Sequence, residues 1–203
     1  MRLLALAVGA AYAAFALTLR GPRERFWERM TLTGAALGGL AFATGPEVRR
    51  ARFRPGDVAL GLASAAGLYA IFRAGDAFAR QVMPQGDAEI GDIYALRELR
   101  PKEELALRLA LVIGPAEELF WRGYVQSRAG YLVTTALYGG AHIVTENWTL
   151  VGAATVAGAY WGLLRALGAP LGALVASHVA WDIWIFLIGP TRSVSGKPAP
   201  GSR

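Results

Sequence analysis

Two adjacent glutamates, Glu117 and Glu118, lie in an otherwise apolar stretch of the chain and are followed by Arg122. The run Leu105 to Ile113 before them is interrupted only by Arg108. A charged side chain at the centre of a membrane-spanning helix costs roughly 2.5–3.5 kcal/mol, so such residues indicate a functional site by default. Glu118 and Arg122 are four residues apart and can form an ion pair on one helix face. That pairing leaves Glu117 free for chemistry.

The two histidines of the chain also lie in apolar runs. His142 follows Tyr138 by about one helical turn, and His178 shares a helix face with Asp182, four residues later. Each group also has a purely structural interpretation, as a helix–helix hydrogen bond or as a satisfied ion pair. Because both histidines and the mid-span acids fall in one half of the chain, we favour a function: a polar site inside the membrane.

These residue types suit hydrolysis in two ways. In the first, Glu117 and His142 polarise a water molecule as general base, and His178 and Asp182 stabilise the oxyanion. In the second, the same four residues bind zinc or another divalent metal, which lowers the pKa of its bound water. The H-E-x-x-H signature of zinc proteases is absent. The spacing therefore leaves open whether the site binds a metal ion or works without a cofactor.

The composition places these groups in a membrane protein. The 203 residues are 54% hydrophobic, and only seven charged side chains occur between Leu109 and Gly189. The net charge is +6, but the arginines cluster at the ends of apolar runs, which fits lipid headgroups and not nucleic acid. Without cysteine, the chain can form neither disulfides nor thiol-based sites.

We predict an all-α, polytopic bundle of about seven to eight transmembrane helices, forming one domain over residues 1–188, with a disordered tail over 189–203. The connection Arg73 to Glu104 is expected outside the hydrocarbon, with a short amphipathic helix near Asp92 to Leu99 that either gates the site or simply links spans. The first span could instead be a signal peptide, but further spans follow it. The predicted spans are Leu3–Leu19, Met30–Gly45, Val58–Phe72, one from near Glu103, Tyr131–Val144, Leu150–Leu164 and Leu171–Ile188.

Three motifs follow one another on separate predicted helices: E-E-x-x-x-R at Glu117, Glu118 and Arg122, Tyr-x-x-x-His at Tyr138 and His142, and His-x-x-x-Asp at His178 and Asp182. Together they resemble the CPBP family of CAAX prenyl proteases and bacteriocin-processing enzymes, also called Abi proteins. The flanking sequence P-A-E-E-L-F-W-R-G-Y resembles the first motif of that family. The resemblance covers residues 105–186.

The resemblance implies an intramembrane endopeptidase, acting either as a metalloprotease or as a glutamate protease. Glu117 and His142 would activate water, while His178 and Asp182 would contact the oxyanion or a metal. Glu118 and Arg122, with Tyr138, would shape the site. Tyr138 stands where Phe is commoner, and Asp182 stands where Asn is frequent. Since a carboxylate anion cannot donate a hydrogen bond to an oxyanion, Asp182 must be protonated or ligate a metal.

We therefore expect a multi-pass protein of the bacterial cell membrane that acts on a peptide or a lipid-modified protein and contacts membrane lipids, not nucleic acid. A transporter that uses the buried Glu, His and Asp as a proton or ion relay is an alternative. An inverted-repeat transporter should show two similar halves, which this chain lacks. A third possibility is a catalytically inactive membrane scaffold.

Overall fold

The computed structural model describes residues 2–188, and within this range the chain is all-α, without a strand. The predicted tail, 189–203, lies outside the described residues. The helices are α1 (Arg2–Arg20), α2 (Phe26–Thr44), α3 (Pro46–Arg49), α4 (Pro55–Val82), α5 (Gly86–Ala95), α6 (Lys102–Arg108), α7 (Gly114–Glu117), α8 (Gln126–Ala129), α9 (Tyr131–Gly140), α10 (Trp148–Ala166) and α11 (Leu171–Ile183). Short 3₁₀ segments are η1 (Arg23–Arg25), η2 (Leu96–Leu99) and η5 (Ile143–Thr145), and π-helical segments are η3 (Leu109–Ile113), η4 (Glu118–Val125) and η6 (Trp184–Ile188).

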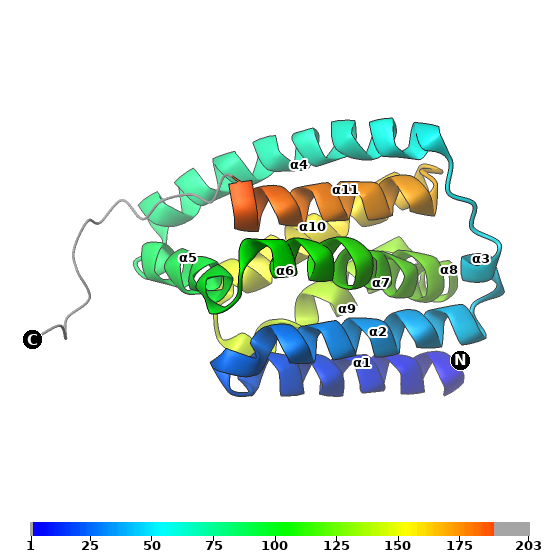
Figure 1. Ribbon diagram of the computed structural model, residues 1–203, viewed down its shortest axis with the longest axis horizontal. Helices are drawn as coiled ribbons and strands as arrows, with labels where there is room; N and C mark the ends of the chain where they lie inside the picture. The colour runs from blue at the N-terminus through cyan, green and yellow to red at the C-terminus, as the bar shows by residue number, and fades with distance from the viewer. Residues whose placement is uncertain (1, 189–203) are drawn as a thin grey trace, which may run out of the picture.

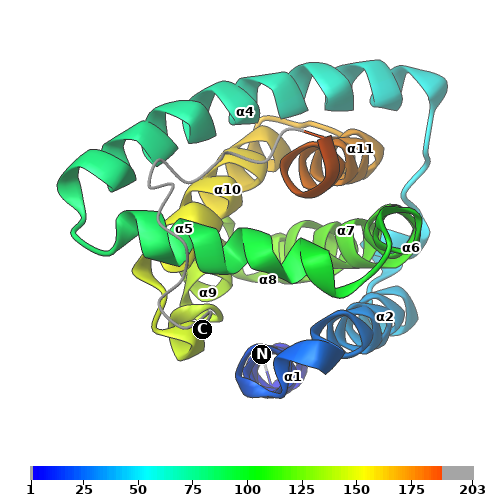
Figure 2. The same ribbon diagram turned by 60° about the vertical axis from the view of Figure 1, so that its left-hand side comes forward.

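The helices form a bundle around the segment α6 to α8. Figures 1 and 2 show this segment between the α1–α2 pair on one side and the α4–α11 pair on the other. Helix α10 packs on α9 and also contacts α4, α5 and α11. The central position of α6 to α8 fits its sequence, because this segment carries the buried charges.

Three helical segments of the described chain are long and apolar enough to cross a membrane: Arg2–Arg20, Pro55–Val82 and Leu171–Ile188. They overlap the first, third and seventh predicted spans, and the third is longer than predicted. Helix α9 has 10 residues, which corresponds to about 15 Å of helix and falls short of a hydrocarbon core of about 30 Å. The structure is thus an all-α membrane bundle in which some helices are too short to cross the hydrocarbon core.

Helix α4 continues beyond the predicted end at Phe72 and reaches Val82. Its last turns carry charges that pair along the helix, with Arg80 Nε 3.1 Å from Asp76 Oδ1. The helix ends where Pro84 follows, since a proline disfavours the helical conformation of the residue before it. The predicted connection therefore begins with the last turns of α4, and the change in composition at Arg73 does not mark the end of the helix.

The short helix predicted near Asp92 to Leu99 lies earlier in the chain, as α5, and is followed by the 3₁₀ turn η2. Long-range hydrogen bonds from η1, from α2 and from the start of α10 hold this segment. Trp27 Nε1 donates to the Leu96 carbonyl oxygen at 2.8 Å, and Arg23 Nη2 donates to the Asp92 carbonyl oxygen at 2.8 Å. Glu89 Oε2 accepts from both the backbone N–H and the hydroxyl of Thr149, at 2.9 and 2.6 Å.

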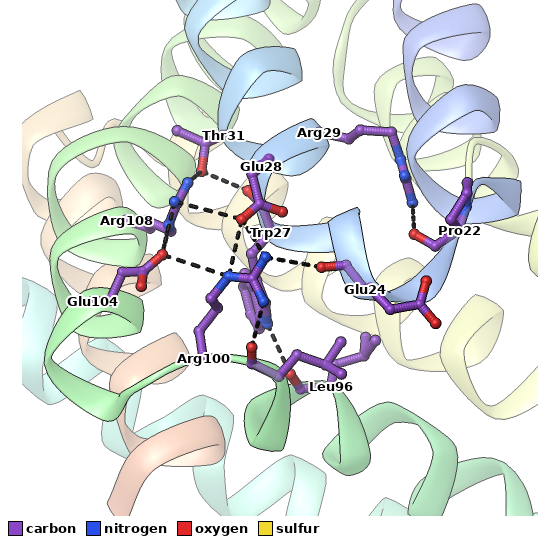
Figure 3. Close-up of polar contacts among 11 residues, drawn as sticks. Pro22, Glu24, Trp27, Glu28, Arg29, Thr31, Leu96, Arg100, Glu104 and Arg108 are labelled. Carbon is purple, nitrogen blue, oxygen red and sulfur yellow. Dashed lines mark hydrogen bonds and ion pairs between the residues drawn. The ribbon is translucent and has the colours of Figure 1, made fainter.

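A network of ionic contacts fixes the start of the central helix against α2 (Figure 3). Arg100 donates to Glu28 Oε1 from Nε at 2.9 Å and from Nη2 at 2.5 Å. Arg108 bridges Glu104 Oε1 at 2.9 Å and the hydroxyl of Thr31 at 2.9 Å. Because these contacts join two helices, they set the register of the segment that carries the glutamates.

Candidate active site

The segment Lys102 to Ala129 is one continuous helix with π-helical turns on both sides of α7. Pro115 lacks the N–H that an α-helix needs, and its ring would crowd the preceding turn. The N–H of Gly114 bonds to the carbonyl oxygen of Leu109, five residues earlier, which widens the helix before the proline. π-Helical turns of this kind often occur at functional sites. The two glutamates follow directly.

The Glu117 region packs closely on α2 through small residues. A Cβ at Gly38 would lie 2.9 Å from Ala116 Cβ and 3.2 Å from Ala116 Cα. Such distances are too short for any side chain, so the two helices can meet here only because α2 has glycine. This contact buries the turn that presents Glu117, whose exposed fraction is 5%.

Glu118 and Arg122 form the ion pair that their spacing predicts. Arg122 Nη1 lies 3.2 Å from Glu118 Oε1, and the two residues are 1% and 0% exposed, respectively. The guanidinium carbon of Arg122 also stands 4.5 Å from the centre of the Tyr138 ring and 5.4 Å from that of Trp161. The positive charge is therefore compensated by one carboxylate and two aromatic faces.

Glu118 also contacts a histidine from a distant helix. His178, on α11, has Nδ1 2.8 Å from Glu118 Oε1, and its Nε2 lies 3.6 Å from Asp182 Oδ2. The indole of Trp161 stacks on the imidazole at 4.1 Å and 18°, and Trp161 Nε1 donates to Ser177 Oγ at 3.0 Å. Sequence spacing predicts the His178–Asp182 contact but not the contact with Glu118. Trp161 and Ser177 were missed too, because an aromatic residue and a serine in an apolar helix give no distinct signal.

His142 lies just beyond the end of α9 and not inside a helix, so the predicted span Tyr131–Val144 is too long. The backbone N–H of His142 bonds to the Gly139 carbonyl oxygen at 3.1 Å. Its Nδ1 is 2.9 Å from the Tyr138 carbonyl oxygen. A carbonyl can only accept, so Nδ1 is the donor, and in the neutral ring Nε2 keeps the lone pair. The imidazole thus caps the helix with one nitrogen and offers a base with the other.

Glu117 is bonded to Tyr138 and not to Arg122. The Tyr138 hydroxyl donates to Glu117 Oε2 at 2.7 Å. The Tyr138 ring in turn meets the His142 ring edge-on, with centroids 5.3 Å apart, and Phe15 of α1 covers the imidazole at 5.4 Å. Helix α1 therefore packs as part of the wall of the site.

A cavity of about 540 Å³ brings these residues together. Its polar lining includes Glu117, Tyr138, His142, His178 and Asp182. Glu118 and Arg122 do not line the cavity and are buried behind its wall. The rest of the lining is mostly apolar and aromatic, from α1, α2, α4, α5, α10 and α11, with Phe15, Trp27, Phe72, Ile90, Tyr94 and Trp181 among it. The α5 segment, expected in a connection, thus forms part of the cavity wall.

The predicted metal ligands are not arranged around one point. Residues 2–188 hold no group of three or more His, Cys, Asp or Glu side chains placed to bind one metal ion. Glu117 is bonded to Tyr138, while His178 is engaged by Glu118 and lies beside Asp182. This arrangement does not fit a bound zinc ion, so the steps proposed below use only a water molecule and the side chains.

Comparison with known families identifies the segment that carries the site. Residues 104–184 match the family model described as type II CAAX prenyl endopeptidase Rce1-like. This segment is therefore similar to the CAAX prenyl endopeptidases of that family. No curated protein and no solved structure matches the chain. The matched segment is roughly two fifths of the chain and includes every predicted site residue from Glu117 to Asp182. Family and apolar helices together make this an integral membrane protein.

Proposed function

We propose that this protein is an intramembrane endopeptidase in which Glu117 and His142 activate a water molecule. The observation that carries the proposal is the convergence of Glu117, His142, His178 and Asp182 on one cavity within an apolar bundle. These residues come from α7, from the turn after α9 and from α11. Their meeting point has a carboxylate base, an imidazole with a free lone pair and a second imidazole, which is a set of groups suited to hydrolysis.

The proposed hydrolysis uses the Glu117 carboxylate and the Nε2 atoms of His142 and His178. A water molecule between Glu117 and His142 Nε2 loses a proton to the Glu117 carboxylate as its oxygen attacks the peptide carbonyl carbon. The carbonyl oxygen becomes an oxyanion. In this proposal the His178 ring is doubly protonated, so that Nδ1 donates to Glu118 while the N–H on Nε2 stabilises the oxyanion. Glu117 then passes the proton to the peptide nitrogen, and the carbon–nitrogen bond breaks.

The surrounding residues hold the second imidazole in place. Glu118 accepts from Nδ1 of His178 at 2.8 Å, so the ring presents Nε2 to the cavity. Asp182 lies 3.6 Å from Nε2 and orients that side of the ring. Arg122 compensates the charge of Glu118 at 3.2 Å. This assigns Glu118 and Arg122 to positioning, and Asp182 to the oxyanion side.

The substrate we propose is the C-terminal segment of a lipid-modified protein, or a peptide of similar amphipathic character. The matching family model is described as a CAAX prenyl endopeptidase, which supports a lipid-modified substrate. The cavity of about 540 Å³ has a mostly apolar lining with one polar cluster. Such a lining suits a peptide that carries a lipid group. The membrane itself supplies the other partner, the lipids around the bundle.

The decisive experiment compares purified wild type with Glu117→Gln in nanodiscs, on a fluorogenic peptide ending in a CAAX sequence, with and without a farnesyl group on its cysteine. Loss of the general base should lower kcat/KM by about 10²–10⁴-fold. Glu103→Gln is the matched control, because Glu103 is an exposed glutamate at the start of the same helix. We expect it to leave cleavage unchanged.

Each outcome of that experiment decides between the functions considered. Equal cleavage by wild type and Glu117→Gln would refute the proposed base. Cleavage that a chelator abolishes would replace the metal-free steps by metal-bound water. If neither peptide is cleaved while wild type carries protons across liposome membranes, the transporter alternative holds. Full cellular function of Glu117→Gln would indicate a scaffold.

A further inference from the structure

The contact between Tyr138 and Glu117 joins two of the three motifs across separate helices. The Tyr138 hydroxyl lies 2.7 Å from Glu117 Oε2, and both side chains are 5% exposed. A phenylalanine at this position would leave Glu117 without this bond. Among residues 2–188, no other side chain hydrogen-bonds to Glu117. The hydroxyl therefore decides where the carboxylate points.

We propose that Tyr138 is a positioning residue that holds both members of the water-activating pair, an inference that rests on the proposed function. Its hydroxyl binds Oε2 of Glu117, which leaves Oε1 to take the proton from water. Its main-chain carbonyl accepts from Nδ1 of His142 at 2.9 Å, which leaves Nε2 toward the cavity. One residue thus fixes two bases from two different parts of the chain.

The Tyr138 ring is itself rigidly held, which a positioning role requires. The Arg122 guanidinium stands 4.5 Å above the ring, and the Trp121 indole meets it at 5.5 Å and 72°. On the side of α10, a Cβ at Gly158 would lie only 2.8 Å from Cδ1 of the ring. The ring therefore has neighbours on several sides, and its hydroxyl has a fixed place beside Glu117.

The test is Tyr138→Phe, which keeps these ring contacts and removes only the hydroxyl. Loss of a hydrogen bond to a charged or polar base corresponds to about a tenfold fall in kcat. We expect KM to stay within about twofold, because the peptide does not bind the hydroxyl. Tyr160→Phe is the matched control: its hydroxyl donates to the Ser64 carbonyl oxygen at 2.9 Å, and it does not line the cavity. It should leave kcat unchanged.

Infrared difference spectroscopy gives a readout that does not depend on cleavage. The spectrum of wild type minus Glu117→Gln isolates the carboxyl band of Glu117. The same difference taken in the Tyr138→Phe background should show that band shifted, because its hydrogen-bond donor is gone. In the Tyr160→Phe background the band should stay where it is in wild type.

An unshifted band in the Tyr138→Phe background would overturn the proposal. So would a shifted band with kcat unchanged, because the bond would then exist without positioning a base. If wild type cleaves neither peptide, the proposed function fails first and takes the catalytic consequence with it. The band still decides the contact in that case, so the two failures are distinguishable.

Discussion

Replacing Glu118 by glutamine should destabilise the bundle far more than the same change at Glu117. The Glu118 carboxylate is 0% exposed and lies 3.2 Å from the Arg122 guanidinium. At that distance and an effective dielectric constant of about 20, the Coulomb attraction is about 5 kcal/mol. Breaking a buried pair by removing one partner costs about 3–5 kcal/mol, because the other charge stays buried. The glutamine oxygen can still accept from His178, so the charge is the main loss.

Thermal unfolding of purified protein in one detergent measures this difference. For a protein of this size, about 3–5 kcal/mol corresponds to a fall in Tm on the order of 10 °C. Glu117→Gln should stay within a few degrees of wild type, because glutamine can still accept from the Tyr138 hydroxyl. Combining Glu118→Gln with Arg122→Met removes both charges and should recover part of the loss. Equal Tm values for Glu117→Gln and Glu118→Gln would refute the buried ion pair as the cause. A double variant with a lower Tm than Glu118→Gln would refute it as well.

Two further predictions concern the elements that support the site. Gly38→Leu should lower the free energy of unfolding by about 1–3 kcal/mol through overpacking against Ala116. Gly39→Leu is the control, because no atom lies within 4 Å of its Cβ position. Equal Tm values for the two variants would contradict the close helix contact. Burial raises the pKa of the Glu89 carboxyl, but hydrogen bonds from Thr149 lower it more, so the pKa lies below its ordinary value. The stabilisation by Glu89 is therefore complete above a pH of about 4.3 and is lost as pH falls through the lower folded pKa. Glu89→Gln should reduce Tm at pH 7, and the reduction should be smaller at pH 3. An equal reduction of Tm at both pH values would refute the stabilisation by ionised Glu89.

Contacts within one helix could be predicted from the sequence. Glu118 and Arg122, and likewise His178 and Asp182, are separated by four residues, and the structure places these pairs at 3.2 and 3.6 Å. The spacing suffices because the geometry of a helix is local and needs no knowledge of what packs around it. The all-α fold could be predicted for the same reason, from long apolar runs that each form a helix.

Contacts between helices could not be predicted in this way. The bond between Glu118 and His178 joins residues 60 positions apart, and that between Glu117 and Tyr138 joins residues 21 apart. Both depend on how far each helix is rotated about its axis. Tight contacts such as Gly38 against Ala116 set that rotation, and a glycine in an apolar run does not tell which neighbour it will meet.

Helix ends were the other source of error. The apolar run around His142 continues to Val144, but α9 stops at Gly140. Hydropathy reports what surrounds a residue and not its backbone conformation, so it cannot detect a turn between apolar residues. Helix α4 shows the converse, because its charged turns after Phe72 stay helical until Pro84 approaches. The end of α4 follows backbone chemistry, through Pro84.

The separate surroundings of Glu117 and Glu118 explain how an apolar helix carries two adjacent acids. Successive residues of a helix point in directions about 100° apart, so neighbouring carboxylates need not share surroundings. Glu118 turns into the packed interior, where Arg122 and His178 bind the same oxygen, Oε1, at 3.2 and 2.8 Å. Glu117 turns to the cavity, where Tyr138 is its bonded partner and space for water remains. A carboxylate bound to a cation cannot readily take a proton from water, whereas one held by a single hydroxyl can. The first acid therefore suits the role of base because the second one satisfies the arginine.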